Sequence, residues 1–155
     1  MKVQDIMTRW VKTVGPDTQL FEVVPFMCIH RLAGLPVVEG DNRLVGFVAE
    51  KDVLHHLFPR LEDLMEGIAS IDFEAMESDY RNILQLRVAD LMAKRVISVG
   101  PEMPVLKAVS IMVKHHFRRI PVVSDGKLVG VLSMGDVHKA LFTQNFNVGS
   151  TPDQK

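Results

Sequence analysis

The sequence has little cysteine, few aromatic residues and no long apolar segment. Cys28 is the only cysteine, so no intrachain disulfide can form, and this usage fits a reducing compartment. No apolar run reaches the roughly 18 residues that a membrane-spanning helix needs, and the N-terminus shows no signal-peptide pattern. The net charge of −1 provides no general attraction to nucleic acid or to an anionic membrane. The composition, 47% hydrophobic and 24% charged, is that of a globular protein, which we expect to be cytoplasmic and without membrane insertion.

The sequence does contain an internal repeat. The stretch VQDIMTRWVKTVGPDT at residues 3–18 matches VADLMAKRVISVGPEM at residues 88–103. GLPVVEGDNRLVGFVAEKDVLHHLF at residues 34–58 matches RIPVVSDGKLVGVLSMGDVHKALF at residues 119–142, with one residue deleted in the turn. Because a repeat decides the architecture before local patterns do, we divide the chain at its repeats. The predicted parts are a first repeat (1–58), a helical insertion (59–87), a second repeat (88–142) and a flexible tail (143–155).

Each repeat predicts the order β-α-β-β-α. A short β-prone run stops at Gly-Pro, an amphipathic helix follows, and two short strands lead into a last helix. The second pair of strands is joined by Asp-Gly, which is typical of a type I′ hairpin. We therefore predict an α/β fold in which the two repeats cover each other's bare sheet faces as a pseudo-two-fold pair. The predicted elements lie at residues 11–14, 19–31, 35–38, 44–49 and 50–57, and at 96–99, 104–116, 120–123, 128–133 and 134–142.

The insertion has no counterpart elsewhere in the chain. Its segments LEDLMEGI and FEAMESDYRNILQLR have the pattern of amphipathic helices rich in acidic residues. One interpretation is a helical linker with a solvated acidic face. The other is an arm that docks a partner or a second copy of the chain.

The recurring landmarks, written DIM…TV.P…PVV….LVG.V…DV, resemble the cystathionine β-synthase (CBS) domain, whose tandem pair is called a Bateman module. The resemblance covers residues 3–58 and 88–142. It implies a non-enzymatic regulatory module that binds an adenosine-containing ligand in a cleft between the repeats. It also implies a homodimer in which four repeats form a flat disc, acting on a regulated protein partner that the sequence does not identify.

The family's ligand motif, Gly-h-h-Ser/Thr-x-x-Asp, is complete only in the second repeat. There it reads GVLSMGD and supplies Ser133 and Asp136, whereas GFVAEKD in the first repeat keeps Asp52 without the hydroxyl. A carboxylate can accept hydrogen bonds from both ribose hydroxyls, and a hydroxyl at a helix N-terminus suits phosphate. Ser-x-x-Asp at a helix start is also a capping motif that needs no ligand, and the sequence leaves both interpretations open.

Two arginines, Arg118 and Arg119, precede the second repeat's Ile-Pro, where related domains carry basic residues facing a phosphate. A guanidinium presents a planar fork that fits phosphate oxygens, although two solvated cations would look the same in sequence. The first repeat has Ala33-Gly34 here, so the fold does not require the charge. An arginine pair favours AMP, ADP or ATP over a positively charged sulfonium ligand, and NAD is left as an alternative. The resemblance places the adenine against Ser98, Val99, Pro101, Ile120 and Pro121, and a weaker second site at Asp52, Thr13, Val14 and Pro16.

The remaining candidates carry less information. Paired histidines at 55–56 and 115–116 lack companion ligands at metal spacing, so we predict no metal site. We expect Cys28 to be a small buried residue and Trp10 to lie at the edge of the core, with an exposed contact role as its alternative. With no nucleophile–base–acid set and no P-loop, an enzyme is not predicted. The leading hypothesis is an adenine-nucleotide or energy sensor without a catalytic cofactor. Its alternative is a structural dimerisation module with no physiological ligand.

Overall fold

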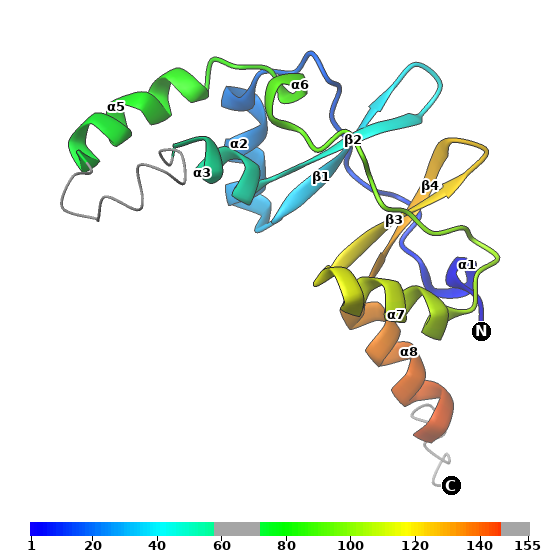
Figure 1. Ribbon diagram of the computed structural model, residues 1–155. Helices are drawn as coiled ribbons and strands as arrows, with labels where there is room; N and C mark the ends of the chain where they lie inside the picture. The colour runs from blue at the N-terminus through cyan, green and yellow to red at the C-terminus, as the bar shows by residue number, and fades with distance from the viewer. Residues whose placement is uncertain (58–71, 147–155) are drawn as a thin grey trace, which may run out of the picture. The chain divides into compact units, whose positions relative to one another are not determined.

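The computed structural model describes residues 1–57 and 72–146 (Figure 1). It contains two compact units, and neither coincides with one sequence repeat. Unit 1 comprises Met1–Val11 and Ile97–Lys155, and unit 2 comprises Lys12–Val96. The first eleven residues of the chain therefore belong with the elements of the second repeat. The matching residues at the start of the second repeat belong with the elements of the first.

Unit 1 is built on one antiparallel hairpin with helices packed against it. Arg119 pairs with Ser133 at its open end, and Ser124 pairs with Lys127 at its turn. The two turn residues, Asp125 and Gly126, have φ values of 53° and 78°, which confirms the type I′ geometry expected from Asp-Gly. The elements of unit 1 are α1 (Val3–Ile6), α7 (Val105–His115), β3 (Arg119–Ser124), β4 (Lys127–Ser133) and α8 (Met134–Phe146).

Unit 2 repeats this plan and adds a helix from the insertion. That helix, α5, is capped at its N-terminus by Asp72, whose side chain accepts a hydrogen bond from the amide of Ala75 at 3.1 Å. It contacts α3 and contributes the buried Ile83 to the core of unit 2. The segment LEDLMEGI lies outside the described residues. The elements of unit 2 are α2 (Leu20–His30), β1 (Gly34–Glu39), β2 (Arg43–Ala49), α3 (Glu50–Leu57), α5 (Phe73–Ile83) and α6 (Val88–Leu91).

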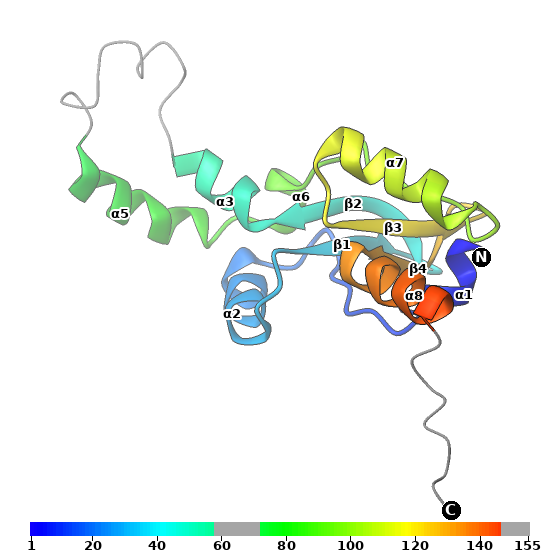
Figure 2. The ribbon, with the colours of Figure 1, turned by 90° about the horizontal axis from the view of Figure 1, so that it is seen from below.

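The N-terminal segment is part of the core of unit 1. Val3 is fully buried and Met7 is nearly so, and both pack in one cluster with Met112, Ile120 and Leu132. Burying a side chain the size of valine stabilises a fold by about 1.5–3 kcal/mol, so this segment contributes substantially to stability. Figure 2 shows α1 beside α8, which it contacts.

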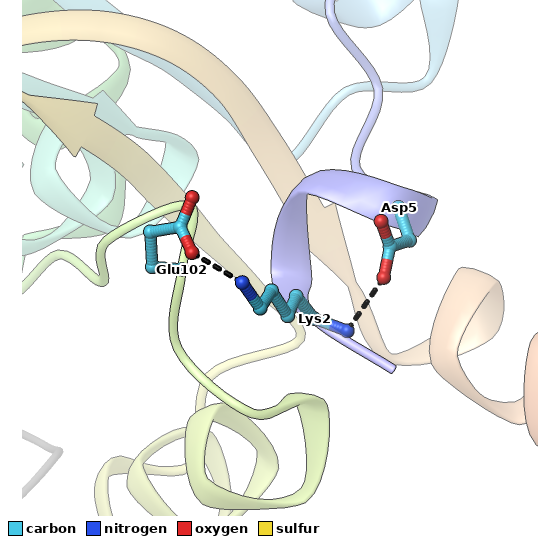
Figure 3. Close-up of polar contacts among 3 residues, drawn as sticks. All are labelled: Lys2, Asp5 and Glu102. Carbon is cyan, nitrogen blue, oxygen red and sulfur yellow. Dashed lines mark hydrogen bonds and ion pairs between the residues drawn. The ribbon is translucent and has the colours of Figure 1, made fainter.

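The aspartates of the repeated DIM and DLM motifs cap a short helix in each exchanged segment, residues 1–11 in unit 1 and 88–96 in unit 2. Asp5 accepts a hydrogen bond from the amide of Lys2 at 2.7 Å, which caps α1, and Lys2 in turn forms an ion pair with Glu102 (Figure 3). The hydrogen bond and charge of Lys2 lower the pKa of Glu102, and those of Glu102 raise the pKa of Lys2. Asp90 caps α6 in the same way, accepting from the amide of Arg87 at 2.9 Å.

Some predicted elements differ from the structure. The β-prone runs at 11–14 and 96–99 each form a single parallel bridge, Val14 with Val37 and Val99 with Val122, because Gly-Pro ends each run at once. The four-residue helices α1 and α6 were not predicted, since so short a segment shows no periodicity. Helix α8 continues to Phe146, so the predicted tail at 143–155 begins as helix.

Two predictions about single residues were wrong. Cys28 is exposed, and Trp10 is 96% exposed and not at the edge of the core. Helix α2 is apolar on nearly every side, so its pattern did not show which face is buried. In the described part of the chain, no helix combines the length and apolarity that crossing a membrane requires.

Candidate ligand site

Unit 1 brings the four predicted ribose and phosphate residues to one place, the junction of β4 and α8. The hydroxyl oxygen of Ser133, the last residue of β4, accepts a hydrogen bond from the amide of Asp136 at 3.0 Å. Arg119 lies directly opposite Ser133 in the hairpin. The carbonyl oxygen of Arg118 accepts a hydrogen bond from the amide of Met134 at 2.9 Å. The start of α8 is therefore fixed to the segment that carries both arginines.

The two arginines are available for a ligand. Both are exposed, and neither forms an ion pair with another described residue. Within the described part of the chain, no ion pair therefore uses their charges to stabilise the fold. Two guanidinium groups beside a helix N-terminus make the junction locally positive, which favours an anion with several oxygens.

The carboxylate of Asp136 is bonded in a way that the sequence did not predict. Its Oδ2 lies 3.4 Å from Oγ1 of Thr8, which comes from the N-terminal segment. Ser133 caps the helix with its own hydroxyl, so the carboxylate of Asp136 is not used to cap the strand-to-helix junction. A single long hydrogen bond leaves most of the acceptor capacity of the carboxylate unused.

The predicted adenine-pocket residues divide between the core and the arginine side of the hairpin. The amide of Val99 donates to the carbonyl oxygen of Pro121 at 3.0 Å, and its side chain is buried in the core. Because side chains alternate along β3, Pro121 shares the face of Arg119, but unlike Arg119 it is buried; Ile120 is fully buried on the core face. Ser98 is exposed, and Pro101 accepts a hydrogen bond from the amide of Gln4 in α1 at 2.9 Å.

An open groove of about 600 Å³ borders Asp136 within unit 1. It runs along α1 and α8, and its lining includes Asp5, Ile6, Lys139 and Thr143. This volume falls within the usual range for small-molecule sites. Of the predicted ligand residues, Asp136 alone lines this groove, so the groove makes the carboxylate accessible from the side of α1 and α8 and does not include Ser133 or the arginines.

The equivalent junction of unit 2 is arranged differently. Oδ2 of Asp52 accepts a hydrogen bond from the amide of Ala49 at 2.8 Å, so here the carboxylate itself caps the start of α3. The ring of Phe47 packs against Gly34, the position that Arg119 holds in unit 1, and a Cβ there would lie 2.5 Å from the ring. An aromatic ring thus occupies the space in which unit 1 carries a cation.

The other second-site residues keep the backbone pattern of unit 1. The amide of Val14 donates to the carbonyl oxygen of Pro36 at 3.1 Å, and the amide of Val38 donates to the carbonyl oxygen of Val14 at 2.9 Å. Thr13 and Pro16 are half-buried beside this bridge. The two junctions therefore have equivalent backbone hydrogen bonds and differ in their side chains.

Comparison with known proteins places these observations in a family context. The family model "CBS domain" matches residues 3–59 and 88–143. MJ1426 of Methanocaldococcus jannaschii is 31% identical over 154 residues, covering 91% of this chain and 91% of its own length. Among solved structures, CBSX2 of Arabidopsis thaliana in complex with AMP is 26% identical with a TM-score of 0.71, covering 93% of this chain and 98% of that chain. MJ1225 of M. jannaschii is 26% identical with a TM-score of 0.73 over 90% of this chain, which spans about half of that protein (47%).

Proposed function

The chain belongs to the CBS domain family and carries two copies of the domain, and from this premise we propose that it is a regulatory module that senses an adenine nucleotide. The proposed ligand is AMP, ADP or ATP, bound at the junction of β4 and α8 in unit 1. The observation that carries the proposal is that this junction joins two arginines, which form no ion pair within residues 1–57 and 72–146, to a carboxylate that is not used as a cap. The AMP complex of CBSX2, at 26% identity, supports the choice of ligand.

Each part of a nucleotide has a chemically matched partner in this proposal. Asp136 accepts hydrogen bonds from the two ribose hydroxyls, as acidic residues do in dinucleotide sites. Arg118 or Arg119 pairs with phosphate oxygens, and Ser133 lies between these groups at the helix N-terminus. The backbone at 98–101 borders the adenine, with Pro121 as the apolar wall on the arginine side. Ile120 supports this wall from the core.

We propose one strong site per chain. Unit 2 lacks the hydroxyl and both arginines, its carboxylate is used as a cap, and Phe47 packs where the cation would stand. Asp52, Thr13, Val14 and Pro16 then form at most a weak site.

The active form in this proposal is a homodimer. Large apolar side chains are exposed on α7 (Leu106, 63%; Val113, 56%) and on α8 (Phe142, 50%; Phe146, 69%), and the rings of Phe142 and Phe146 stack at 5.0 Å. Large exposed apolar side chains on neighbouring helices are typical of association surfaces, and a symmetric dimer is the commonest way to cover them. Nucleotide binding would then be transmitted to a regulated protein partner.

The same apolar surface favours a second candidate function, a structural dimerisation module without a nucleotide ligand. The two functions are separated by calorimetric titration of the full chain with AMP, ADP and ATP, with GMP as the control for the base. The sensor predicts saturable binding of adenine nucleotides at one tight site per chain, with GMP much weaker. Absence of saturable heat with all three adenine nucleotides up to millimolar concentration would contradict the sensor and leave the structural module.

A further inference from the structure

The exchange of N-terminal segments brings Thr8, a residue of the first sequence repeat, into unit 1. We propose that Thr8 is a positioning residue for Asp136 and that it determines how strongly the site distinguishes ribose from deoxyribose. This inference depends on the nucleotide site proposed above. It adds a specificity residue from a part of the sequence that the ligand motif does not include.

The backbone of Thr8 is fixed, so the fold holds its side chain close to the end of β4. Its amide donates to the carbonyl oxygen of Val131, and its carbonyl oxygen accepts from the amide of Val131, both at 2.9 Å. Gly130 allows this close approach, because a Cβ there would lie 2.8 Å from the carbonyl oxygen of Thr8. Two hydrogen bonds and the close packing of the two backbone segments hold Thr8 in register with the end of β4.

The hydroxyl of Thr8 lies where it can orient the carboxylate of Asp136. The distance from Oγ1 of Thr8 to Oδ2 of Asp136 is 3.4 Å. Unit 2 shows the alternative orientation, in which the carboxylate of Asp52 turns back to accept from the amide of Ala49 at 2.8 Å. Thr8 stabilises the orientation in which the carboxylate is directed away from the cap and remains able to accept hydrogen bonds from a ligand.

The residue equivalent to Thr8 in unit 2 is Ala93, which makes the same backbone contacts without a hydroxyl. Ala93 exchanges two hydrogen bonds with Phe47, at 2.8 and 3.0 Å. The fold therefore accepts alanine at this position, and the hydroxyl is not needed to hold the segment. The unit with Thr8 also carries the serine and the two arginines, while the unit with Ala93 has alanine and glycine at those positions. The hydroxyl accompanies the other ligand-binding groups, as expected of a group that serves the ligand.

The test compares AMP with 2′-deoxy-AMP on the full chain by calorimetry. The ratio of the two dissociation constants measures how well the ribose hydroxyls are held. Thr8→Val keeps the shape of the side chain and removes the hydroxyl, and Thr8→Ala introduces the residue that unit 2 already has, in case valine disturbs the fold. Losing one orienting hydrogen bond is expected to weaken AMP binding about two- to tenfold, with a smaller effect on 2′-deoxy-AMP, so the ratio falls.

Two controls define the outcome. Thr8→Ser retains the hydroxyl and should restore the wild-type ratio, and Ser110→Ala, which removes an exposed hydroxyl on α7, should leave it unchanged. An unchanged ratio in both Thr8→Val and Thr8→Ala overturns the role of Thr8 while the nucleotide site stands. Equal weakening of both ligands also overturns it, because a purely structural residue would have that effect. If the wild type binds neither ligand, the nucleotide site is wrong and the role of Thr8 falls with it.

Discussion

Replacing Asp136 and Asp52 with alanine should affect different properties of the protein, although the two residues are equivalent in the repeat. The carboxylate of Asp52 accepts a hydrogen bond from the amide of Ala49 at 2.8 Å and caps α3. The carboxylate of Asp136 makes no such cap, because Ser133 performs that task with its hydroxyl. Asp52→Ala should therefore reduce stability, and Asp136→Ala should reduce nucleotide affinity.

The expected magnitudes follow from the contacts that are removed. Loss of an N-terminal cap costs about 0.5–2 kcal/mol of folding free energy, and we expect a value in this range for Asp52→Ala. Asp136→Ala loses only the long hydrogen bond from Thr8, so its cost in stability should lie at the low end of about 0.5–1.5 kcal/mol. In binding it loses hydrogen bonds to a charged group, worth about 1.5–3 kcal/mol, which corresponds to roughly ten- to a hundredfold in the dissociation constant for AMP.

Both variants can be measured by urea unfolding without ligand and by calorimetric titration with AMP. Asp52→Ala is expected to lower the unfolding midpoint with little change in the affinity for AMP. Asp136→Ala is expected to lower the affinity for AMP with little change in the unfolding midpoint. If the wild type binds AMP and Asp136→Ala binds it equally well, the ribose assignment is wrong. If Asp136→Ala is destabilised as much as Asp52→Ala, the carboxylate of Asp136 has a structural role that the contacts do not show.

Three other predictions test the assembly and the attachment of the N-terminal segment. The exposed apolar side chains of α7 and α8 predict a homodimer, so light scattering at micromolar concentration should give twice the 17.4 kDa of one chain, and the mass of one chain would exclude it. Glu102→Gln should lower the melting temperature at pH 7, because the ion pair with Lys2 holds the pKa of Glu102 below its ordinary 4.5. The difference in melting temperature between wild type and variant should be complete above pH 4.5 and disappear as the pH falls through the lowered pKa. A difference that persists below that pKa would contradict a stabilising ion pair between Lys2 and Glu102. Gly130→Ala should cost about 1–3 kcal/mol, because its Cβ would lie 2.8 Å from the carbonyl oxygen of Thr8, whereas Gly100→Ala, with open space around the added Cβ, should cost much less.

The main helices and the hairpin strands could be predicted to within a few residues because local pattern determines them. The apolar stripe of α7, the Asp-Gly turn between β3 and β4 and the Gly-Pro that precedes each unit's first long helix are all sequence signals of short range. The same holds for the β4–α8 junction, whose Ser-x-x-Asp motif correctly marked the start of a helix. Such signals do not show which segment packs on which hairpin. They also could not show that Cys28 and Trp10 are exposed, because exposure depends on tertiary packing.

The exchange of segments between the units was not predicted, although the repeat contains a signal for it. Gly46 and Gly130 match, and so do Met7 and Met92. In the structure each glycine faces the methionine of the exchanged segment, with an added Cβ 2.5 Å from the sulfur of Met92 or 2.9 Å from that of Met7. A glycine and a large flexible side chain that recur together indicate a close contact, but their spacing along the chain does not identify which copies meet.

The two junctions differ at more side-chain positions when residues are assigned to the structural units than when they are assigned to the sequence repeats. When residues are assigned by repeat, Thr8 belongs to the half of the chain that lacks the serine and the arginines, so the ligand-site groups are divided between the two repeats. By unit, Thr8 joins Ser133 and the arginines, and unit 2 is left with alanine or glycine at every equivalent position. The packing of Phe47 accounts for glycine at position 34, but both units keep the same backbone bridges, so packing does not account for the difference in side chains at the other three positions. A ligand that contacts only unit 1 would account for it. Thr8 is the one of these groups that the two divisions assign differently, so the Thr8 variants, and not the number of tight sites, test whether the unit is the functional division of this protein.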